Sequence, residues 1–325
     1  MGRAGRLAVY LQSMFPPLVM LPAGIAMVGA VHGTLQALTG PQGGGPIHYG
    51  WRSWVAAASA VLFMLLMRVF DELKDVESDL ALGKAGDPRY KDRPIVTGAV
   101  RVEDVRLLRW AVTGLLFLLN LPLLVPGGAS GPGWPVAGLA FLLAYGLAWL
   151  SFKWFFWPAI QKNLLLAFAT HNPLTGFVIL YVVAVWAEGA GLQRLEPLAS
   201  ALLVLGLWLP VSAWETSRKI RVPQDETTYQ TYSMLLGWKV APFLPLLFGA
   251  GAATCLTLVS RQAGLGWGYP AALWSAWAVL AGACLRFRFA PTTARAKLQP
   301  FAELFSVVSS LGLLVAVLVA RGVQW

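Results

Sequence analysis

Residues 63–79 read Phe-Met-Leu-Leu-Met-Arg-Val-Phe-Asp-Glu-Leu-Lys-Asp-Val-Glu-Ser-Asp, an apolar run that passes without a break into a regular series of carboxylates. Asp71, Asp75 and Asp79 are four residues apart, and this spacing places their side chains on one side of a helix. Carboxylates stacked on successive turns repel one another, so we expect a cation among them. A divalent ion that prefers hard oxygen ligands, such as Mg²⁺, is the expected cation. At a membrane boundary, such a site suits a diphosphate substrate.

The composition of the 325-residue chain indicates an integral membrane protein, since 57% of the residues are hydrophobic and only 12% are charged. Nine apolar stretches each approach the roughly 20 residues that a spanning helix needs. They predict an all-α membrane protein with nine transmembrane helices in a single domain, residues 1–325, because open sheets cannot span lipid. The predicted spans are residues 8–31, 51–70, 106–125, 134–151, 163–186, 197–214, 239–260, 268–285 and 302–320.

The basic residues orient this bundle. With nine spans, one side of the membrane receives every Lys and Arg except Arg52, Arg194, Arg261 and Arg321. The positive-inside rule identifies that basic side as cytoplasmic, and the agreement supports the number of spans. The N-terminus is basic and then apolar, like a signal peptide, but its apolar run is too long and lacks a cleavage site. We therefore expect a retained first helix, and the net charge of +10 reports topology rather than nucleic-acid binding.

Polar chemistry is confined to the predicted cytoplasmic side. Nine of the 15 acidic residues lie in residues 71–104, and three more lie in residues 215–226. Cys255 and Cys284 fall inside predicted spans and the three His are scattered, so we expect no disulfide framework and no thiolate or histidine metal centre. We expect a multi-pass protein of a bacterial cytoplasmic membrane, with its active site facing the cytoplasm.

The segment from Asp71 to Gly98 resembles the first signature of the UbiA superfamily of intramembrane prenyltransferases. That signature begins with Asn or Asp and continues with aspartates at the fourth and eighth following positions, which Asp71, Asp75 and Asp79 match. An Arg-Pro dipeptide and a small-residue turn follow in the family, as Arg93-Pro-Ile-Val-Thr-Gly98 does here. The predicted number of helices also agrees. The resemblance implies a UbiA-like bundle with a central cavity open to the cytoplasmic face.

The resemblance to the family's second signature, in the loop after the sixth span, is partial. Glu215 stands where the family usually has Asp, and Arg221 stands where another Asp is expected. Asp225 is the candidate for the missing ligand. The basic residues Arg218, Lys219 and Arg221 are either positive-inside anchors or direct ligands of a diphosphate. In the second case they would reduce the reliance on a second Mg²⁺, so the number of bound ions stays open.

The resemblance implies Mg²⁺-dependent transfer of a prenyl group from an isoprenoid diphosphate to an aromatic or other lipophilic acceptor. The implied catalytic and metal-binding residues are Asp71, Asp75, Asp79 and Glu215, with Asp225 as a further metal ligand. Lys91 and Arg93, with Arg89 nearby, would hold the diphosphate. Lys153 is either another diphosphate ligand or an interfacial anchor. Within the fifth span, Pro173 is expected to kink the helix.

Other functions share some of these features. A UbiA-type terpene cyclase would use the same ionisation but close the prenyl chain on itself, which product analysis without an acceptor would reveal. A CDP-alcohol phosphotransferase also has membrane aspartates, but its Asp-Gly…Ala-Arg…Gly pattern is absent from the sequence. A membrane lipid-binding or transport protein would place its carboxylates near the middle of the membrane rather than at one face. The residues leave the acceptor, the prenyl length and the oligomeric state open.

Overall fold

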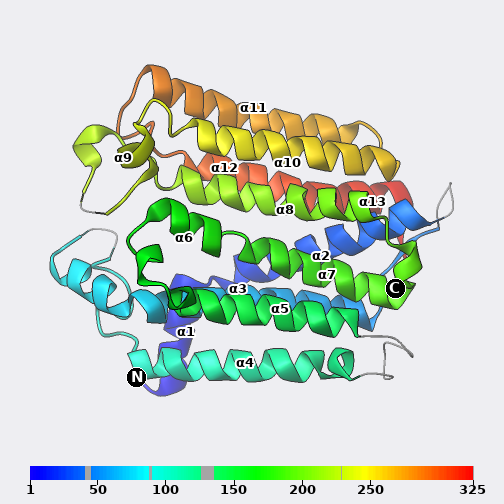
Figure 1. Cartoon of the computed structure of the whole chain (residues 1–325), viewed down its shortest axis with the longest axis horizontal. Helices are drawn as coiled ribbons and strands as arrows, with labels where there is room; N and C mark the ends of the chain where they lie inside the picture. Colours follow the sequence, from blue (N-terminus) through cyan, green and yellow to red (C-terminus); the bar gives the residue numbers. More distant parts are fainter. Residues whose placement is uncertain (41–44, 88–89, 126–134, 228, 325) are drawn as a thin grey trace.

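The computed structural model describes residues 1–40, 45–87, 90–125, 135–227 and 229–324. They form a helical bundle whose long helices run side by side (Figure 1). Within these ranges, eight helical segments are long and apolar enough to cross a membrane, by length and composition, and α5 (Val136–Phe152) is a shorter apolar helix. The predicted all-α membrane bundle is confirmed.

The long helical segments of the described chain close into a ring. Each segment packs against the next one along the sequence, and the last helix, α13, packs against α2. Neighbours in sequence therefore bury one another's faces, which is the packing that holds helices together inside lipid. The segments are α2 (Pro17–Thr39), α3 (Trp51–Lys84), α4 (Val102–Leu124), α5, α6 and α7 (Leu164–His171 and Leu174–Ala190), α8 (Pro197–Ser217), α10 (Phe243–Gln262), α11 (Gly268–Phe289), and α12 and α13 (Gln299–Val307 and Leu313–Arg321).

Shorter elements cover the two ends of the ring. The helix α9 (Tyr232–Leu236) lies at the same end as α6. Within the last span, a π-helical turn, Val308–Gly312, joins α12 to α13. At the other end, the short strands β1 (Ile47–His48) and β2 (Val323–Gln324) pair in parallel. Because β1 leads into α3 and β2 follows α13, this pairing joins an early part of the chain to its last described residues (Figure 1).

The predicted first span, residues 8–31, is wrong at its start. A separate helix, α1 (Arg3–Met14), precedes α2, and the chain is non-helical at Phe15 and Pro16. The physical reason is the Pro16-Pro17 pair, because a proline pushes the preceding residue out of the helical region while it suits the first turn of a new helix. Figure 1 shows α1 lying across the bundle, where Arg6 Nε donates to Asp104 Oδ2 of α4 at 2.6 Å.

Two features of the long helices position the candidate site. The 34 residues of α3 exceed what a crossing needs, so its last turns carry the three aspartates beyond the apolar run. We call this end of the bundle the aspartate end and the other the far end.

The predicted kink at Pro173 is confirmed, because α6 ends at His171 and α7 begins at Leu174. Asn172, at the break, accepts hydrogen bonds from Trp208 and Ser212 of α8 at 2.8 and 2.6 Å.

A buried polar network ties three helices together inside the bundle. The Asn120 amide of α4 donates to Ser59 Oγ of α3 at 2.8 Å, and its oxygen accepts from the Tyr181 hydroxyl of α7 at 2.6 Å. All three side chains are buried. The network satisfies polar groups that lipid could not hydrogen-bond, so Asn120 has a structural role in the fold.

The closest helix approach gives a test of the packing. A Cβ added at Gly138 of α5 would lie 2.4 Å from the carbonyl oxygen of Leu123 in α4, whereas a Cβ at Gly146 of the same helix meets nothing within 4 Å. We expect Gly138→Ala to cost about 1–3 kcal/mol through backbone overpacking, and to lower the melting temperature in detergent. Gly146→Ala is the matched control and should melt like the wild type or higher. Equal melting temperatures for the two variants would contradict the close contact between α4 and α5.

Candidate functional site

The last turns of α3 carry the aspartate column, Asp71, Asp75 and Asp79, with the predicted four-residue spacing. Asp71 exposes 53% of its side chain, Asp75 is half-buried, and Asp79 exposes only 8%. The column thus runs from an open carboxylate to a buried one. Like charges one turn apart repel. Nearby cations offset this repulsion at Asp71 and Asp79.

Asp71 is paired with a lysine of its own helix. Lys74 Nζ lies 2.9 Å from Asp71 Oδ1, and the Lys74 side chain is only 6% exposed. The same ammonium lies 4.3 Å from the ring centroid of Trp154, within cation–π range. The sequence interpretation missed Lys74, and the signal that it could have used is a cation three residues after the first aspartate.

The turn that brings Trp154 to this lysine has an unusual backbone. Trp154, Phe155 and Phe156 have φ values of 51°, 51° and 53°, all in the left-handed region. Such a conformation costs roughly 1–2 kcal/mol per residue for side chains other than glycine. The Trp154 ring also lies 5.0 Å from the ring of His171, next to the break between α6 and α7. Backbone strain is therefore concentrated at the aspartate end, as it often is at functional sites.

Asp79 is paired with the arginine that the sequence singled out. Arg93 Nη1 donates to Asp79 Oδ2, and the guanidinium lies 4.4 Å from the Tyr90 ring centroid. The loop that carries Arg93 is docked tightly on α3, since a Cβ on Gly83 would lie 2.4 Å from Val96 Cγ1. The structure thus brings the Arg-Pro segment to the aspartate column.

Lys91 of this loop and Lys153 after α5 form no ion pair with the column. Lys91 is exposed, and it forms no ion pair with another described residue. Arg89 lies outside the described residues. Lys153 follows α5 and is exposed, with its Nζ 4.9 Å from the Phe152 ring centroid, which is the geometry of an interfacial anchor. Their assignment to the diphosphate stays a prediction.

A second charged cluster forms at the end of α8. Glu215 Oε2 accepts from Arg218 Nε at 2.6 Å, while Glu215 Oε1 lies 2.8 Å from Lys219 Nζ. Both carboxylate oxygens are thus engaged by cations. Glu215 holds Arg218 and Lys219 as a pair, and its predicted role as a metal ligand stays a prediction. The arrangement favours direct binding of an anion by Arg218 and Lys219.

Arg221 and Asp225 lie at the edge of this second cluster. The Arg221 guanidinium donates to Thr227 Oγ1 at 3.3 Å. Arg221 and Lys219 both lie over the Tyr229 ring, each with its charged group 5.8 Å from the ring centroid. Asp225 ends a short 3-10 turn and is half-buried, and in the described part of the chain it makes no ion pair. The role of Asp225 as a metal ligand therefore stays a prediction.

The second cluster lies at the same end of the bundle as the aspartate column, because α3 and α8 both end there (Figure 1). Burial lowers the pKa of Arg218, but the carboxylate of Glu215 and, with smaller effect, Tyr229 and Asp71 raise it, so that it lies above its ordinary value. The guanidinium is therefore held in its charged form beside Glu215.

The carboxylates fit a metal ion that binds together with phosphate. Among the described residues, no group of three or more His, Cys, Asp or Glu side chains is placed to hold a metal ion. Mg²⁺, however, is usually held by one or two carboxylates, while water and substrate phosphates fill the other positions. The exposed Asp71 and the half-buried Asp75 offer such a pair on adjacent turns.

Comparison with solved structures identifies the fold. An apo structure of a UbiA homolog from Aeropyrum pernix K1 matches with a TM-score of 0.61 and 18% identity, covering 92% of this chain and 97% of that chain. The structure of a digeranylgeranylglyceryl phosphate synthase matches with a TM-score of 0.57 and 14% identity, covering 96% of this chain and 98% of that one. No protein-family model and no curated protein matches the sequence. The predicted UbiA-like fold is confirmed.

The pairing pattern predicts opposite effects for two neighbouring aspartates. Asp79→Asn removes the partner of Arg93 in a largely buried place, so we expect it to destabilise the protein by about 1–3 kcal/mol. Asp75→Asn removes a carboxylate that has no ion-pair partner among the described residues and two like charges one turn away. It should leave stability unchanged or raise it by up to about 0.5 kcal/mol. Thermal unfolding in detergent without Mg²⁺ measures both, and a larger loss for Asp75→Asn would contradict this pattern.

Proposed function

We propose that this chain, whose fold is that of UbiA homologs, is a membrane prenyltransferase that uses Mg²⁺ to ionise an isoprenoid diphosphate. The observation that carries the proposal is that the aspartate column and the Glu215-Arg218-Lys219 cluster lie at the same end of the bundle, where α3 and α8 end (Figure 1). Oxygen ligands for a metal and nitrogen donors for a diphosphate are thus presented at one end of the fold. We also propose that this end faces the cytoplasm of a bacterium, because the basic residues collect there.

The charge balance of the site supports the need for a metal. Its carboxylates are matched by an equal number of cations, namely Asp71, Asp75, Asp79 and Glu215 against Lys74, Arg93, Arg218 and Lys219. A diphosphate adds several negative charges to this neutral set. Some further positive charge must enter with it, since uncompensated charge in a partly buried site is costly. A divalent cation that binds with the substrate meets this need.

The ion would be held by Asp71 and Asp75, and when bound it would neutralise the departing diphosphate. Arg218 and Lys219 would bind the diphosphate oxygens directly, and Glu215 would position these two cations. The Asp79-Arg93 pair would fix the loop over the column. Each of these residues acts on the diphosphate end of the donor.

In the reaction itself, the allylic carbon–oxygen bond breaks and its electron pair leaves with the diphosphate. A nucleophilic carbon or oxygen of an aromatic or other lipophilic acceptor then bonds to the allylic carbon and loses a proton. The apolar helices would shelter the prenyl tail and keep water from capturing the cation. Aromatic faces near the column, such as the Trp154 ring, are suited to stabilise positive charge.

The proposal is tested by diphosphate release. We expect purified protein with prenyl diphosphates of several lengths and an acceptor panel to release diphosphate with Mg²⁺ and not with EDTA. Asp75→Asn should lower the rate by about 100-fold or more, as expected for loss of a charge-stabilising group. Glu77→Gln, an exposed carboxylate two residues away on the same helix, is the matched control and should keep activity.

Two outcomes of this assay would change the assignment. Equal release by wild type and Asp75→Asn would remove the aspartate column from the chemistry. A cyclic prenyl product formed without any acceptor would assign the same site to a terpene cyclase.

Lys74 provides a second test that does not depend on turnover. Because Lys74 is the present counter-ion of Asp71, Lys74→Gln should let Asp71 bind Mg²⁺ more tightly. We expect the Mg²⁺ concentration for half-maximal thermal stabilisation to fall several-fold in the variant. Lys84→Gln, an exposed lysine in the last turn of α3, is the control and should not change it. A weaker Mg²⁺ response in Lys74→Gln would contradict metal binding at Asp71.

A further inference from the structure

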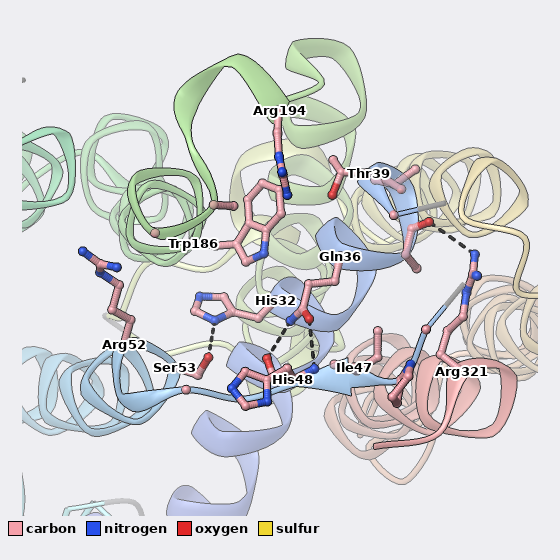
Figure 2. Close-up of a pocket in the computed structure, with 18 of the residues that line it drawn as sticks. His32, Gln36, Thr39, Ile47, His48, Arg52, Ser53, Trp186, Arg194 and Arg321 are labelled. Atoms are coloured by element: carbon pink, nitrogen blue, oxygen red, sulfur yellow. Dashed lines mark hydrogen bonds between the residues drawn. The ribbon is translucent and has the colours of Figure 1, made fainter. Parts of the chain in front are cut away.

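A cavity of about 1040 Å³ opens at the far end of the bundle, away from the aspartate column. Its walls come from the end of α2, β1, the start of α3, the end of α7, the 3-10 turn Leu192–Arg194, and Arg321 at the end of α13 (Figure 2). Elements from both ends of the sequence therefore build it. We call it the arginine cavity, because its lining includes Arg52, Arg194 and Arg321.

Basic residues are concentrated in the arginine cavity, although the far end as a whole has few of them. Only four of the chain's 25 basic residues belong to this side, and three of them line the one cavity. Glu196 is the carboxylate in the lining, so the cavity has an excess of positive charge. Basic residues on this side are otherwise depleted. All four are arginines, whose planar guanidinium fork binds phosphate in a bidentate manner.

The arginines are placed by specific contacts. Arg321 Nη2 donates to the carbonyl oxygens of Ala37 and Ala263 at 3.3 and 3.2 Å. The Arg52 guanidinium lies 5.0 Å from the Trp51 ring centroid, and a Cβ on Gly189 would come within 3.0 Å of Arg52 Cδ. Glycine at that position leaves room for this side chain.

Arg194 is the most accessible of the three arginines. It is exposed and forms no ion pair with another described residue. Figure 2 shows its side chain extending from the 3-10 turn toward Trp186. It is therefore the donor best placed to engage an anion that enters the cavity.

Two other polar side chains of the lining already have hydrogen-bond partners. His32 is 1% exposed, and its ring nitrogens bond to Ser53 Oγ at 2.8 Å (Figure 2) and to the carbonyl oxygen of Val182 at 3.1 Å. The Gln36 amide binds the backbone N–H and carbonyl of His48 at 2.9 and 3.0 Å. The positive charge of the lining comes from its arginines, with Arg194 the most exposed of them.

The first turn of α3 adds to the positive potential. Trp51, Arg52 and Ser53 line the cavity, and Gly50 before them provides no side-chain cap. A helix N-terminus presents unpaired backbone N–H groups and the positive end of the helix dipole. Here it acts together with the arginines rather than alone.

We propose that the arginine cavity binds a phosphate-bearing headgroup of a membrane lipid. Guanidinium groups, a helix N-terminus and a positive balance select an anion with several oxygens, and phosphate fits all three. The cavity lies at the ends of spanning helices, with Trp51 and Trp186 in its wall, where lipid headgroups and interfacial tryptophans meet. Basic pockets between membrane helices bind lipid headgroups in this manner. The site is independent of the proposed prenyl transfer at the aspartate end.

Native mass spectrometry of the full chain tests this proposal, with phosphatidylglycerol and phosphatidylcholine supplied in mixed micelles. We expect wild type to retain phosphatidylglycerol, and Arg194→Gln and Arg52→Gln to lower the retained fraction by about tenfold each, the effect of one charge-assisted hydrogen bond. Arg261→Gln is the matched control, since it removes the fourth far-end arginine, which stacks on Trp267 at 4.2 Å outside the cavity. Arg194→Lys should restore only part of the retention, because it keeps charge without the fork.

A second arm distinguishes lipid phosphate from free phosphate. Inorganic phosphate is titrated against the melting temperature of wild type, Arg194→Gln and Arg261→Gln without added lipid. Stabilisation by inorganic phosphate that Arg194→Gln abolishes, with no lipid retained, would overturn the lipid headgroup and assign the cavity to a soluble phosphate. Lipid retention that is unchanged in Arg194→Gln and Arg52→Gln, or lost equally in Arg261→Gln, would overturn the site altogether. Melting temperatures of the variants in detergent show whether each one is folded.

Discussion

Neutralisation of carboxylates at the aspartate end is the constraint on which the rest of the structure depends. A single helix projects three like charges on successive turns, and a fourth carboxylate, Glu215, arrives from α8. The cation for Asp71 comes from the same helix, the cation for Asp79 from the loop that follows it, and the cations for Glu215 from the turn after α8. Uncompensated charges in such a place are expensive. The register of α3 and the docking of the loop that follows it are therefore linked through charge.

Irregular backbone gathers at the same end. The left-handed turn at Trp154–Phe156 lies in the connection between α5 and α6, and the break at Asn172–Pro173 separates α6 from α7. Inside a membrane protein, such interruptions are tolerated where neighbouring groups satisfy the freed backbone and side-chain atoms. Trp208 and Ser212 do so at Asn172. The left-handed turn and the break thus concentrate irregular backbone near the aspartate column, as is often found around a binding site.

Local patterns made much of this predictable from the sequence. The aspartate spacing, the apolar runs and the kink at Pro173 each depend on residues close together in the chain, and the structure has all three. The first span began in the wrong place because hydropathy does not register a proline break between two apolar segments. The pairing of Lys74 with Asp71 and of Arg218 and Lys219 with Glu215 was not predicted, because sequence spacing allows such pairs but side-chain directions decide which of them form.

In the described residues, nine long helical segments run between the aspartate end and the far end. Because this number is odd, α1 and β2 lie at opposite ends of the bundle. Figure 1 shows α1 at the end of the bundle where α3 ends, and β2 pairs with β1 at the other end. If the aspartate end faces the cytoplasm, as proposed, a reporter fused ahead of α1 would report from the cytoplasm, whereas one fused after β2 would report from the opposite side of the membrane. The two terminal elements thus offer one fusion site on each side of the membrane.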